Sequence, residues 1–317
     1  MKPLLALIIA LPLAGSLQAA ESSTGSAAIA APWLQLSEDA RATAMGQAQV
    51  SVASSTAALA YNPADLAFGS GQDAAFSHLA WIQGSSIEHL AYANSSLLPM
   101  AGLGASLDWF NFGSIQGYNL DASGAPVASG SLHPSAMNLN LGWGQGLPWS
   151  HLAAGAGLKI INQNLDGQSS AWSLAVDLGV HWQSPLPGLS AGFAIQNLGT
   201  QLAGASLPLN VKAGLGYSIQ PRPQDSLVLA LDGNLNAAAD DGSSNTFNLG
   251  GEYWYRGMVA GRLGWQGADR NGLDGLSGLC VGLGARYEAF QFDYAFSAIG
   301  EIGNGQQLSL AYHFASK

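Results

Sequence analysis

Hydrophobic residues alternate with small or polar residues through most of the chain from about Asp73 onward. Every second position from Leu174 to Trp182 is apolar, while the positions between them are small or polar and include Asp177 and His181. Successive side chains of a β-strand point to opposite sides, so such a segment has one apolar face and one small or polar face. The pattern predicts strands that show one face to lipid and the other to a polar interior.

The part of the chain after residue 72 divides into fourteen segments of this kind, which are bounded by Gly, Pro, Asn or Asp. Bacterial single-chain barrels close with an even number of strands, so we expect an all-β fold, a transmembrane antiparallel β-barrel of about 14 strands. The predicted strands are Asp73–Ile82, Ser86–Ser95, Gly102–Phe112, Ala136–Gln145, His151–Asn164, Ser170–Gln183, Leu189–Gln196, Leu209–Ile219, Ser226–Asn236, Thr246–Tyr255, Met258–Gln266, Leu276–Tyr287, Phe290–Ala298 and Gln306–His313.

The links between the predicted strands alternate in length. Arg256–Gly257 and Glu288–Ala289 are examples of the short links, and Gly113–Ser135 and Asn197–Pro208 are examples of the long ones. Outer-membrane barrels have tight turns at the periplasmic end and longer loops at the outer end. We therefore expect the short links on the periplasmic side and the long links outside the cell.

The first residues have the features of a secretory signal peptide. Lys2 precedes a short apolar stretch from Leu4 to Leu13, and small or polar residues follow up to Ala20. No later apolar run approaches the roughly twenty residues that a spanning helix requires. We expect residues 1–20 to be a signal peptide, residues 21–72 to be a separate N-terminal segment, and residues 73–317 to form the barrel.

The composition indicates what surrounds this barrel. Charged residues are 9% of the chain, against roughly a quarter in soluble domains, and Gly accounts for 41 of 317 residues. A hydrophobic share of 48% argues against disorder. An exterior with so little charge does not face water, so we expect the chain to lie among the lipids of the bacterial outer membrane.

Other kinds of chemistry find little support in the sequence. Twenty acidic residues against ten basic ones disfavour nucleic-acid binding. No Cys or His cluster has the spacing of metal ligands and Cys280 is the lone cysteine, so neither a metal nor a cofactor is expected. The run Gly188–Gly192 fits the G-x-S-x-G pattern of hydrolases, but that motif requires a strand, a sharp turn and a helix. Here it opens a predicted strand, so we expect no catalytic residue and no enzyme.

Residues 21–72 are rich in Ala and Ser and show little alternation. Within them, Asn62, Pro63, Ala64 and Asp65 have the features of a helix start, since Asn caps a helix, Pro suits its first turn and an acid is favourable near its positive end. Such a segment could fill the lumen of a barrel of this size as a plug. A periplasmic tail is the alternative.

Several ionisable residues fall at inward positions of the predicted strands, and charges inside a membrane protein are costly unless they are paired or hydrated. They would either pair with the plug, where Arg41 and Asp65 are the natural partners, or line a route for a ligand. The inward candidates are Asp177, His181, Lys212, Arg262, Arg286 and Asp293.

Two further patterns concern the ends of the strands. Tryptophans near these ends are typical of the aromatic girdles at membrane interfaces, with core packing as the alternative. The last strand places Leu308, Leu310, Tyr312 and Phe314 on one face, which resembles the C-terminal signature read by the barrel-assembly machinery during insertion. The predicted girdle residues are Trp81, Trp109, Trp143, Trp149, Trp182, Trp254 and Trp265.

The run ARATAMGQAQVSVASSTAALAYNPADLA, from Ala40 to Ala67, resembles the N-terminal motif of the PorV/PorQ family of outer-membrane proteins, which are related in fold to the FadL transporters. Met45-Gly46 and Asn62-Pro63-Ala64 are its more specific elements. The resemblance continues in Phe76–Ala93, in Ala194–Gly199 and in the strands from Phe292 to Phe314. It implies a FadL-like barrel of fourteen strands with an N-terminal segment in the lumen.

The resemblance implies two roles. FadL-type relatives pass hydrophobic small molecules, whereas PorV serves type IX secretion and engages secreted protein partners. A structural barrel without cargo is the third alternative. A transporter should have an apolar pocket in the outer half, reachable from the Gly113–Ser135 loop, and a docking protein should have a large exposed patch on its long loops. The Ala-, Gly- and Ser-rich loops lack the aromatic and Arg content of protein hot spots, which favours the transporter or the structural alternative.

Overall fold

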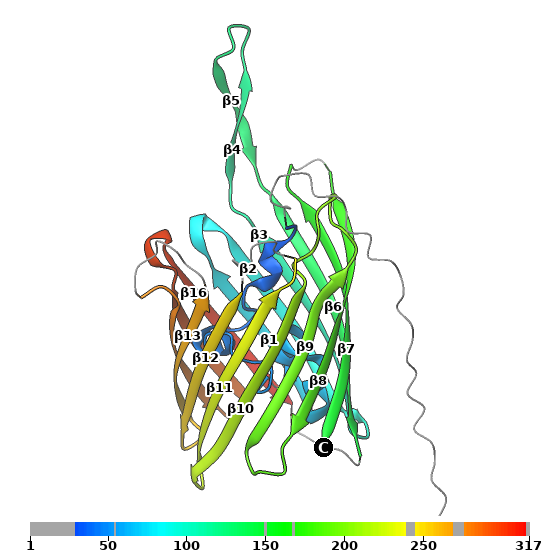
Figure 1. Cartoon of the computed structure of the whole chain (residues 1–317). Helices are drawn as coiled ribbons and strands as arrows, with labels where there is room; N and C mark the ends of the chain where they lie inside the picture. Colours follow the sequence, from blue (N-terminus) through cyan, green and yellow to red (C-terminus); the bar gives the residue numbers. More distant parts are fainter. Residues whose placement is uncertain are drawn as a thin grey trace, which may run out of the picture.

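The computed structural model describes residues 29–53, 55–148, 151–166, 169–238, 245–268 and 276–314, so the predicted signal peptide lies outside the described residues. Within these ranges fourteen strands form a closed antiparallel barrel, in which β1 pairs with β16 to complete the ring (Figure 1). The barrel strands are β1 Gln72–Ala80, β2 Ser86–Leu98, β3 Ala101–Asn111, β6 Ser135–Leu147, β7 Leu152–Asn164, β8 Ala171–Gln183, β9 Leu189–Gly199, β10 Asn210–Arg222, β11 Asp225–Asn236, β12 Thr246–Tyr255, β13 Val259–Ala268, β14 Leu279–Tyr287, β15 Phe290–Ala298 and β16 Asn304–Phe314.

Each predicted strand corresponds to one strand of the barrel, so the prediction of a fourteen-stranded β-barrel is confirmed. The ends differ by a few residues: β2, for example, continues to Leu98, three residues beyond the predicted end. Backbone pairing at a strand end does not need alternating side chains, which is why the polarity pattern places ends less well than centres.

The predicted long loop Gly113–Ser135 contains a two-stranded hairpin, formed by β4 Ile115–Leu120 and β5 Pro126–Leu132, which projects beyond the barrel (Figure 1). The sequence did not predict it, because a ribbon with both faces exposed needs no alternation. At its tip, the Ser123 hydroxyl and backbone N–H groups donate hydrogen bonds to the Asp121 carboxylate, and these bonds hold the pKa of Asp121 below its usual range.

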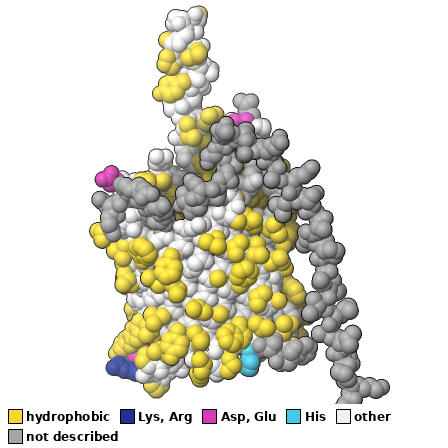
Figure 2. All heavy atoms as spheres, in the orientation of Figure 1, with side chains coloured by type: hydrophobic (Ala, Val, Ile, Leu, Met, Phe, Trp, Pro, Cys, Tyr) yellow, Lys and Arg dark blue, Asp and Glu magenta, His cyan; other side chains and the backbone are white. Residues whose placement is uncertain are grey.

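The two faces of the barrel wall differ as the alternation predicted. In β8, Leu174 is 52% exposed on the outer face, whereas Asp177 is completely buried on the inner face. Figure 2 shows one face of the wall, over which hydrophobic side chains are spread and on which charged groups appear only near the ends. Since water would not favour this much apolar surface, the wall is suited to lipid.

The predicted aromatic girdle needs two corrections. Trp254 is only 2% exposed and lies on the inner face of β12, so its assignment to the girdle was wrong. Trp81 is half-buried and packs against an apolar cluster at one end of the lumen. The outward set comprises Trp109, Trp143, Trp182 and Trp265, and Trp149 lies outside the described residues.

The described part of the N-terminal segment lies inside the barrel (Figure 1), where Met45, Leu59 and Leu66 are at most 1% exposed. We call residues 29–71 the plug. Among the described residues, no helix is both long and apolar enough to cross a membrane. The elements of the plug are η1 Pro32–Gln35, α1 Ala40–Ala44, η2 Ser55–Ala57, α2 Ala58–Tyr61 and η3 Pro63–Phe68; η4 Ile82–Gly84 joins β1 to β2, and η5 Gly300–Ile302 precedes β16.

Candidate functional site

The Asn62-Pro63-Ala64 element of the plug touches the wall where inward positions are glycine. A Cβ atom at Gly155 would lie 2.3 Å from the Ala64 backbone nitrogen, and a Cβ atom at Gly179 would lie 2.0 Å from Asn62 Oδ1. Asn62 Oδ1 also accepts a hydrogen bond from the Ala64 backbone N–H at 3.2 Å, while Asn62 Nδ2 donates to the carbonyl of Val180 at 3.1 Å. The predicted helix start is present as the 3-10 helix η3, and its cap also binds the wall.

The Met45-Gly46 element makes a second close approach. Gly46 has φ +63, a left-handed conformation that favours glycine, and its backbone nitrogen lies 2.2 Å from the position of a Cβ at Gly264. Met45 is completely buried, and its carbonyl oxygen lies 2.5 Å from the Cβ position at Gly250. Both specific elements of the N-terminal motif are therefore places where plug backbone meets wall backbone.

A buried ionic network joins the plug to one side of the wall. Arg41 Nε lies 3.0 Å from Glu252 Oε2, and Arg262 Nε lies 2.6 Å from the same oxygen. Arg262 Nη1 also binds Asp293 Oδ1 at 2.7 Å. Arg41 thus pairs with the wall, although with Glu252, which was absent from the predicted set. Glu252 occupies an inward position of its strand, two residues before Trp254, so the alternation contained the signal.

Asp65, the other predicted plug partner, meets His181 at the opposite side of the lumen. The distance between Asp65 Oδ1 and His181 Nδ1 is 2.5 Å, and the ring of Phe68 lies 4.8 Å from the His181 ring. Asp65 is 1% exposed and His181 6%, so water competes little for this pair. The pair fixes η3 to β8.

The remaining inward candidates form no ion pair with the described residues of the plug. Asp177 Oδ2 lies 2.8 Å from the ammonium of Lys159, a wall residue that the prediction missed. Lys212 lies over the ring of Tyr61, with 5.6 Å between its nitrogen and the ring centroid. These contacts make that part of the lumen a packed and paired interior.

Arg286 faces the lumen at the end of the barrel that carries the short turns, where it remains exposed. Its guanidinium stacks on Trp254 with 3.8 Å to the ring centroid, and its Nε donates to Gln291 Oε1 at 2.7 Å. Trp254 thus serves a cation–π contact inside the barrel, which is the physical reason that it does not belong to the interfacial girdle.

Two further wall residues bind the plug backbone. Asp232 Oδ2 accepts hydrogen bonds from the backbone N–H groups of Gln49 and Val50 at 2.6 and 2.8 Å. Ser190 Oγ donates to the carbonyl of Ser51 at 2.9 Å. Ser190 is the serine of the G-x-S-x-G match, and it lies in strand β9 with no helix after it, so the match marks a contact with the plug.

The proposed insertion residues share one face of β16. Leu308 is 58% exposed and Phe314 is 41% exposed on the outer wall, while Tyr312 contacts the Phe314 ring edge-on at 4.8 Å. Leu310 lies on the same face. Their recognition by the assembly machinery stays a prediction.

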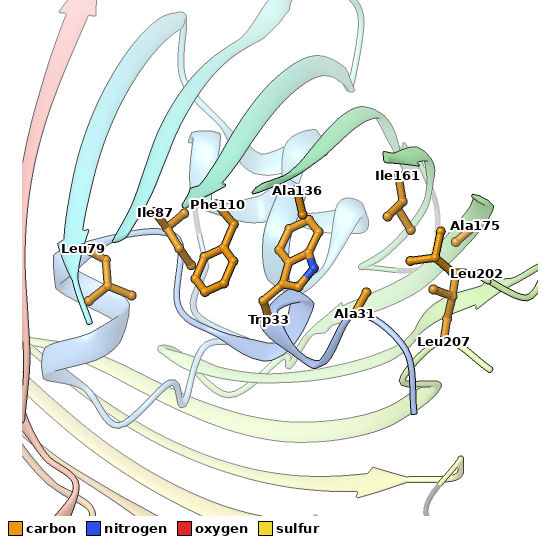
Figure 3. Close-up of a cluster of buried hydrophobic side chains, with 10 residues drawn as sticks. All are labelled: Ala31, Trp33, Leu79, Ile87, Phe110, Ala136, Ile161, Ala175, Leu202 and Leu207. Atoms are coloured by element: carbon orange, nitrogen blue, oxygen red, sulfur yellow. The ribbon is translucent and has the colours of Figure 1, made fainter. Parts of the chain in front are cut away.

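An apolar layer of buried side chains lies between the first described residues of the plug and the wall (Figure 3). Trp33 of the plug stacks on Phe110 of β3 with ring centroids 5.9 Å apart, and Phe110 meets Phe112 edge-on at 4.4 Å. Leu202 and Leu207 reach the same layer from the link between β9 and β10. Its other members come from strands β1, β2, β6, β7 and β8, so the layer joins the plug to one side of the ring.

A cavity of about 300 Å³ lies beside this layer, at the end of the barrel that carries the β4–β5 hairpin. Its walls come from the plug, from η4 and from the end of β3 at the base of the hairpin. Most of the lining is apolar or aromatic, and Gln83 and Ser85 supply polar groups. The lining residues are Pro32, Trp33, Leu36, Trp81, Ile82, Gln83, Ser85, Phe110 and Phe112.

Other hollows have different surroundings. Hollows of about 620, 660 and 720 Å³ lie between outward side chains such as Leu215, Leu263 and Phe292, on the wall that faces lipid, so we do not consider them ligand sites. A more enclosed cavity of about 30 Å³ shares Leu36 and Trp81 with the outer cavity and extends toward Cys280. It has room for about one water molecule.

No protein-family model matches the chain, and no curated protein matches it in sequence. Solved structures do match. The toluene transporter TbuX of Ralstonia pickettii is similar with a TM-score of 0.59 and 14% identity, over 87% of this chain and 98% of that chain. The toluene transporter TodX of Pseudomonas putida has a TM-score of 0.54 and 13% identity, over 86% and 96%. A FadL homologue of Pseudomonas aeruginosa has a TM-score of 0.52 and 12% identity, over 92% and 100%.

At these identities the likeness shows the fold, which is that of FadL-type outer-membrane barrels. The closed ring of strands and its apolar outer wall agree with that fold. The predicted location in the bacterial outer membrane is confirmed.

Proposed function

We propose that this chain binds small hydrophobic molecules at its outer mouth and passes them across the outer membrane, and that it is not an enzyme. The observation that carries the proposal is the aromatic cavity between Trp33 of the plug and Phe110 and Phe112 of the wall. It lies at the base of the hairpin, at the end that the loop lengths predict to face outward, where a transporter was expected to have a pocket. The proteins of similar fold that are described as toluene transporters support the same class of ligand.

The cavity also bears on the size of the ligand. Small-molecule sites range from about 300 to 1,000 Å³ and are lined mainly by apolar and aromatic groups. At about 300 Å³ this cavity is at the small end of that range, and its aromatic walls offer stacking and edge-to-face contacts. It therefore suits a compact apolar molecule better than a long chain.

Passage beyond the cavity requires the plug to move. Below the apolar layer the plug is held by the Arg41–Glu252 pair and by the Asp65–His181 pair, and the adjoining cavity has room for only about one water molecule. A bound ligand that wedges between Trp33 and the wall would favour the displaced plug, since a ligand shifts a conformational equilibrium only through its different affinities for the two states. Release would follow by lateral opening or by displacement of the plug.

Binding and uptake test the proposal together. Toluene and a long-chain fatty acid would be titrated against protein purified in mild detergent, and uptake of the same compounds would be followed in cells that produce it. We expect Phe110→Ala to weaken toluene binding and uptake at least tenfold, because it removes the ring that stacks on Trp33. Trp172→Ala, which removes an outward ring that is 61% exposed, is the matched control.

Equal toluene binding by wild type, Phe110→Ala and Trp172→Ala would contradict this site. A lipid extract and protein mass spectrum of the same purified sample address the other roles. A co-purifying apolar molecule supports passage, and a stoichiometric protein partner without such a molecule supports docking. Recovery of neither, with no uptake, favours a structural barrel.

One observation favours docking of a secreted protein, as in type IX secretion, as a second candidate function. The β4–β5 hairpin exposes Tyr118 at 63% and Leu120 at 75%, and within the described ranges its strands pair only with each other. Unpaired strand edges are suited to adding a strand from a partner. Deletion of residues 115–132 should abolish partner recovery under this hypothesis while leaving toluene binding in the cavity intact.

A further inference from the structure

Three potential metal ligands converge just below the apolar layer. Glu38 lies in the plug between η1 and α1, while His89 and Asp108 face inward from the paired strands β2 and β3. His89 Nδ1 lies 2.6 Å from Asp108 Oδ1 and 3.5 Å from Glu38 Oε2, and one ligand atom of each residue lies within 4.8 Å of the others. His89 and Asp108 are at most 4% exposed.

The three side chains of this cluster carry more negative than positive charge. Two carboxylates face a single imidazole, and the nearby ammonium of Lys159 is engaged 2.8 Å from Asp177. Among the described residues, Glu38 Oε2 is buried and accepts no hydrogen bond. Its ionic contact is the imidazole 3.5 Å away, which lies closer to Asp108, so this oxygen is available to a cation.

A second buried polar group adjoins the cluster. Asn138 is 1% exposed and donates from Nδ2 to Asp108 Oδ2 at 2.9 Å, which fixes the orientation of that carboxylate. Its own Oδ1 has no hydrogen-bond partner among the described residues. Metal-binding carboxylates are commonly held by such a second hydrogen bond.

We propose that Glu38, His89 and Asp108 bind a divalent metal ion of the zinc class, which joins the plug to the wall directly beneath the hydrophobic cavity. Imidazole nitrogen and carboxylate oxygen are established ligands of Zn²⁺, and three protein ligands with a remaining position are typical of sites that stay accessible. The Glu38 side chain is 16% exposed, which leaves a path for the ion.

Two of the three separations between the ligands require little rearrangement, and the third is at most 4.8 Å. Ligands at about 2.1 Å from a tetrahedral ion lie roughly 3.4 Å from one another. The distance between His89 Nδ1 and Glu38 Oε2, 3.5 Å, already fits. The ion would replace the proton between His89 and Asp108, whose 2.6 Å separation would widen by less than about 1 Å.

The alternative is a metal-free cluster in which a protonated His89 bridges both carboxylates. The two arrangements differ in a measurable way, because only the first takes up Zn²⁺. The binding does not depend on the passage of any ligand, so it can be tested apart from the proposed function.

Untagged protein purified in detergent would be treated with a chelator, desalted and titrated with ZnCl₂ by calorimetry, with bound metal counted by elemental analysis. We expect about one Zn²⁺ per chain and a Tm that rises with zinc concentration, because binding to the folded state alone stabilises it. Glu38→Gln and Asp108→Asn, which keep the side-chain volume, should each lower the affinity at least tenfold.

His78→Gln is the matched control, because His78 Nδ1 also lies 2.6 Å from a carboxylate, that of Glu88, but that pair has no third ligand in the described structure. This variant should bind zinc as the wild type does. Absence of zinc binding by the wild type would overturn the proposal. Undiminished binding by both Glu38→Gln and Asp108→Asn would overturn it as well, even if these variants changed the Tm.

Discussion

Replacement of Gly155 by alanine tests whether the close approach of backbones holds the plug. The added Cβ would lie 2.3 Å from the Ala64 nitrogen and 2.4 Å from the Pro63 carbonyl carbon. Carbon atoms in contact are separated by about 3.5 Å, so the plug backbone would have to shift by roughly 1 Å. Strand β7 itself need not change, since alanine is compatible with an extended backbone.

The expected size of the effect follows from overpacking. An extra methyl group in a packed interior costs about 1–3 kcal/mol. If that cost acts on the plugged state alone, the displaced population rises roughly 5- to 150-fold, since about 1.4 kcal/mol corresponds to a factor of ten. Asp65 belongs to the same 3-10 helix, η3, as Pro63 and Ala64. A shift of this helix would therefore also weaken the pair that Asp65 forms with His181.

Displacement of the plug would appear as open events in the conductance of planar bilayers. Gly155→Ala should show open events at least about five times as often as the wild type. Gly261→Ala is the matched control, because Gly261 lies on the outer face of β13 with no atom within 4 Å of its Cβ position. Gel mobility with and without heating would show that both variants are folded barrels. If the folded variants then had equal conductance, the close approach at Gly155 would not hold the plug.

Three further changes test other contacts. Glu252→Gln removes the carboxylate that Arg41 pairs with and leaves Arg262 with Asp293 alone, so it should lower the free energy of unfolding in urea by about 3–5 kcal/mol. Glu301→Gln at the exposed rim should change it by less than about 0.5 kcal/mol. Asp232→Asn removes a charged acceptor from two backbone N–H groups and should increase proteolysis of the plug without unfolding the barrel, as read from the fragment pattern. Leu308→Arg on the lipid face should destabilise the barrel by about 2–4 kcal/mol in bilayer unfolding experiments; no loss there would contradict the outward orientation.

The strands were predictable because their signal is local. A side chain of a strand points to one face or the other according to its position alone, so Leu174 and Asp177 could be placed on opposite faces without any knowledge of neighbouring strands. The same rule would have placed Trp254 and Glu252 on the inner face. The girdle assignment of Trp254 failed because it relied on residue type and nearness to a strand end.

The motif of the plug was also visible in the sequence, but its purpose was not. Asn62 caps η3, and Gly46 adopts a left-handed backbone conformation. Both roles depend only on the neighbouring residues in the chain. That they lie against Gly179 and Gly264 depends on where the plug runs inside the ring. The hairpin β4–β5 gave no signal, since neither of its faces is buried.

By itself, then, the sequence determined the number of strands, the lipid-facing wall and the presence of a distinct N-terminal segment, because each follows from local alternation or composition. Only the tertiary structure decided which inward groups meet. Arg41 and Glu252 are 211 residues apart in the chain, and Glu38 joins His89 and Asp108 from a separate segment. These contacts depend on the register of the strands, on the pairing of β1 with β16 and on the path of the plug inside the ring. A local sequence pattern does not determine all three.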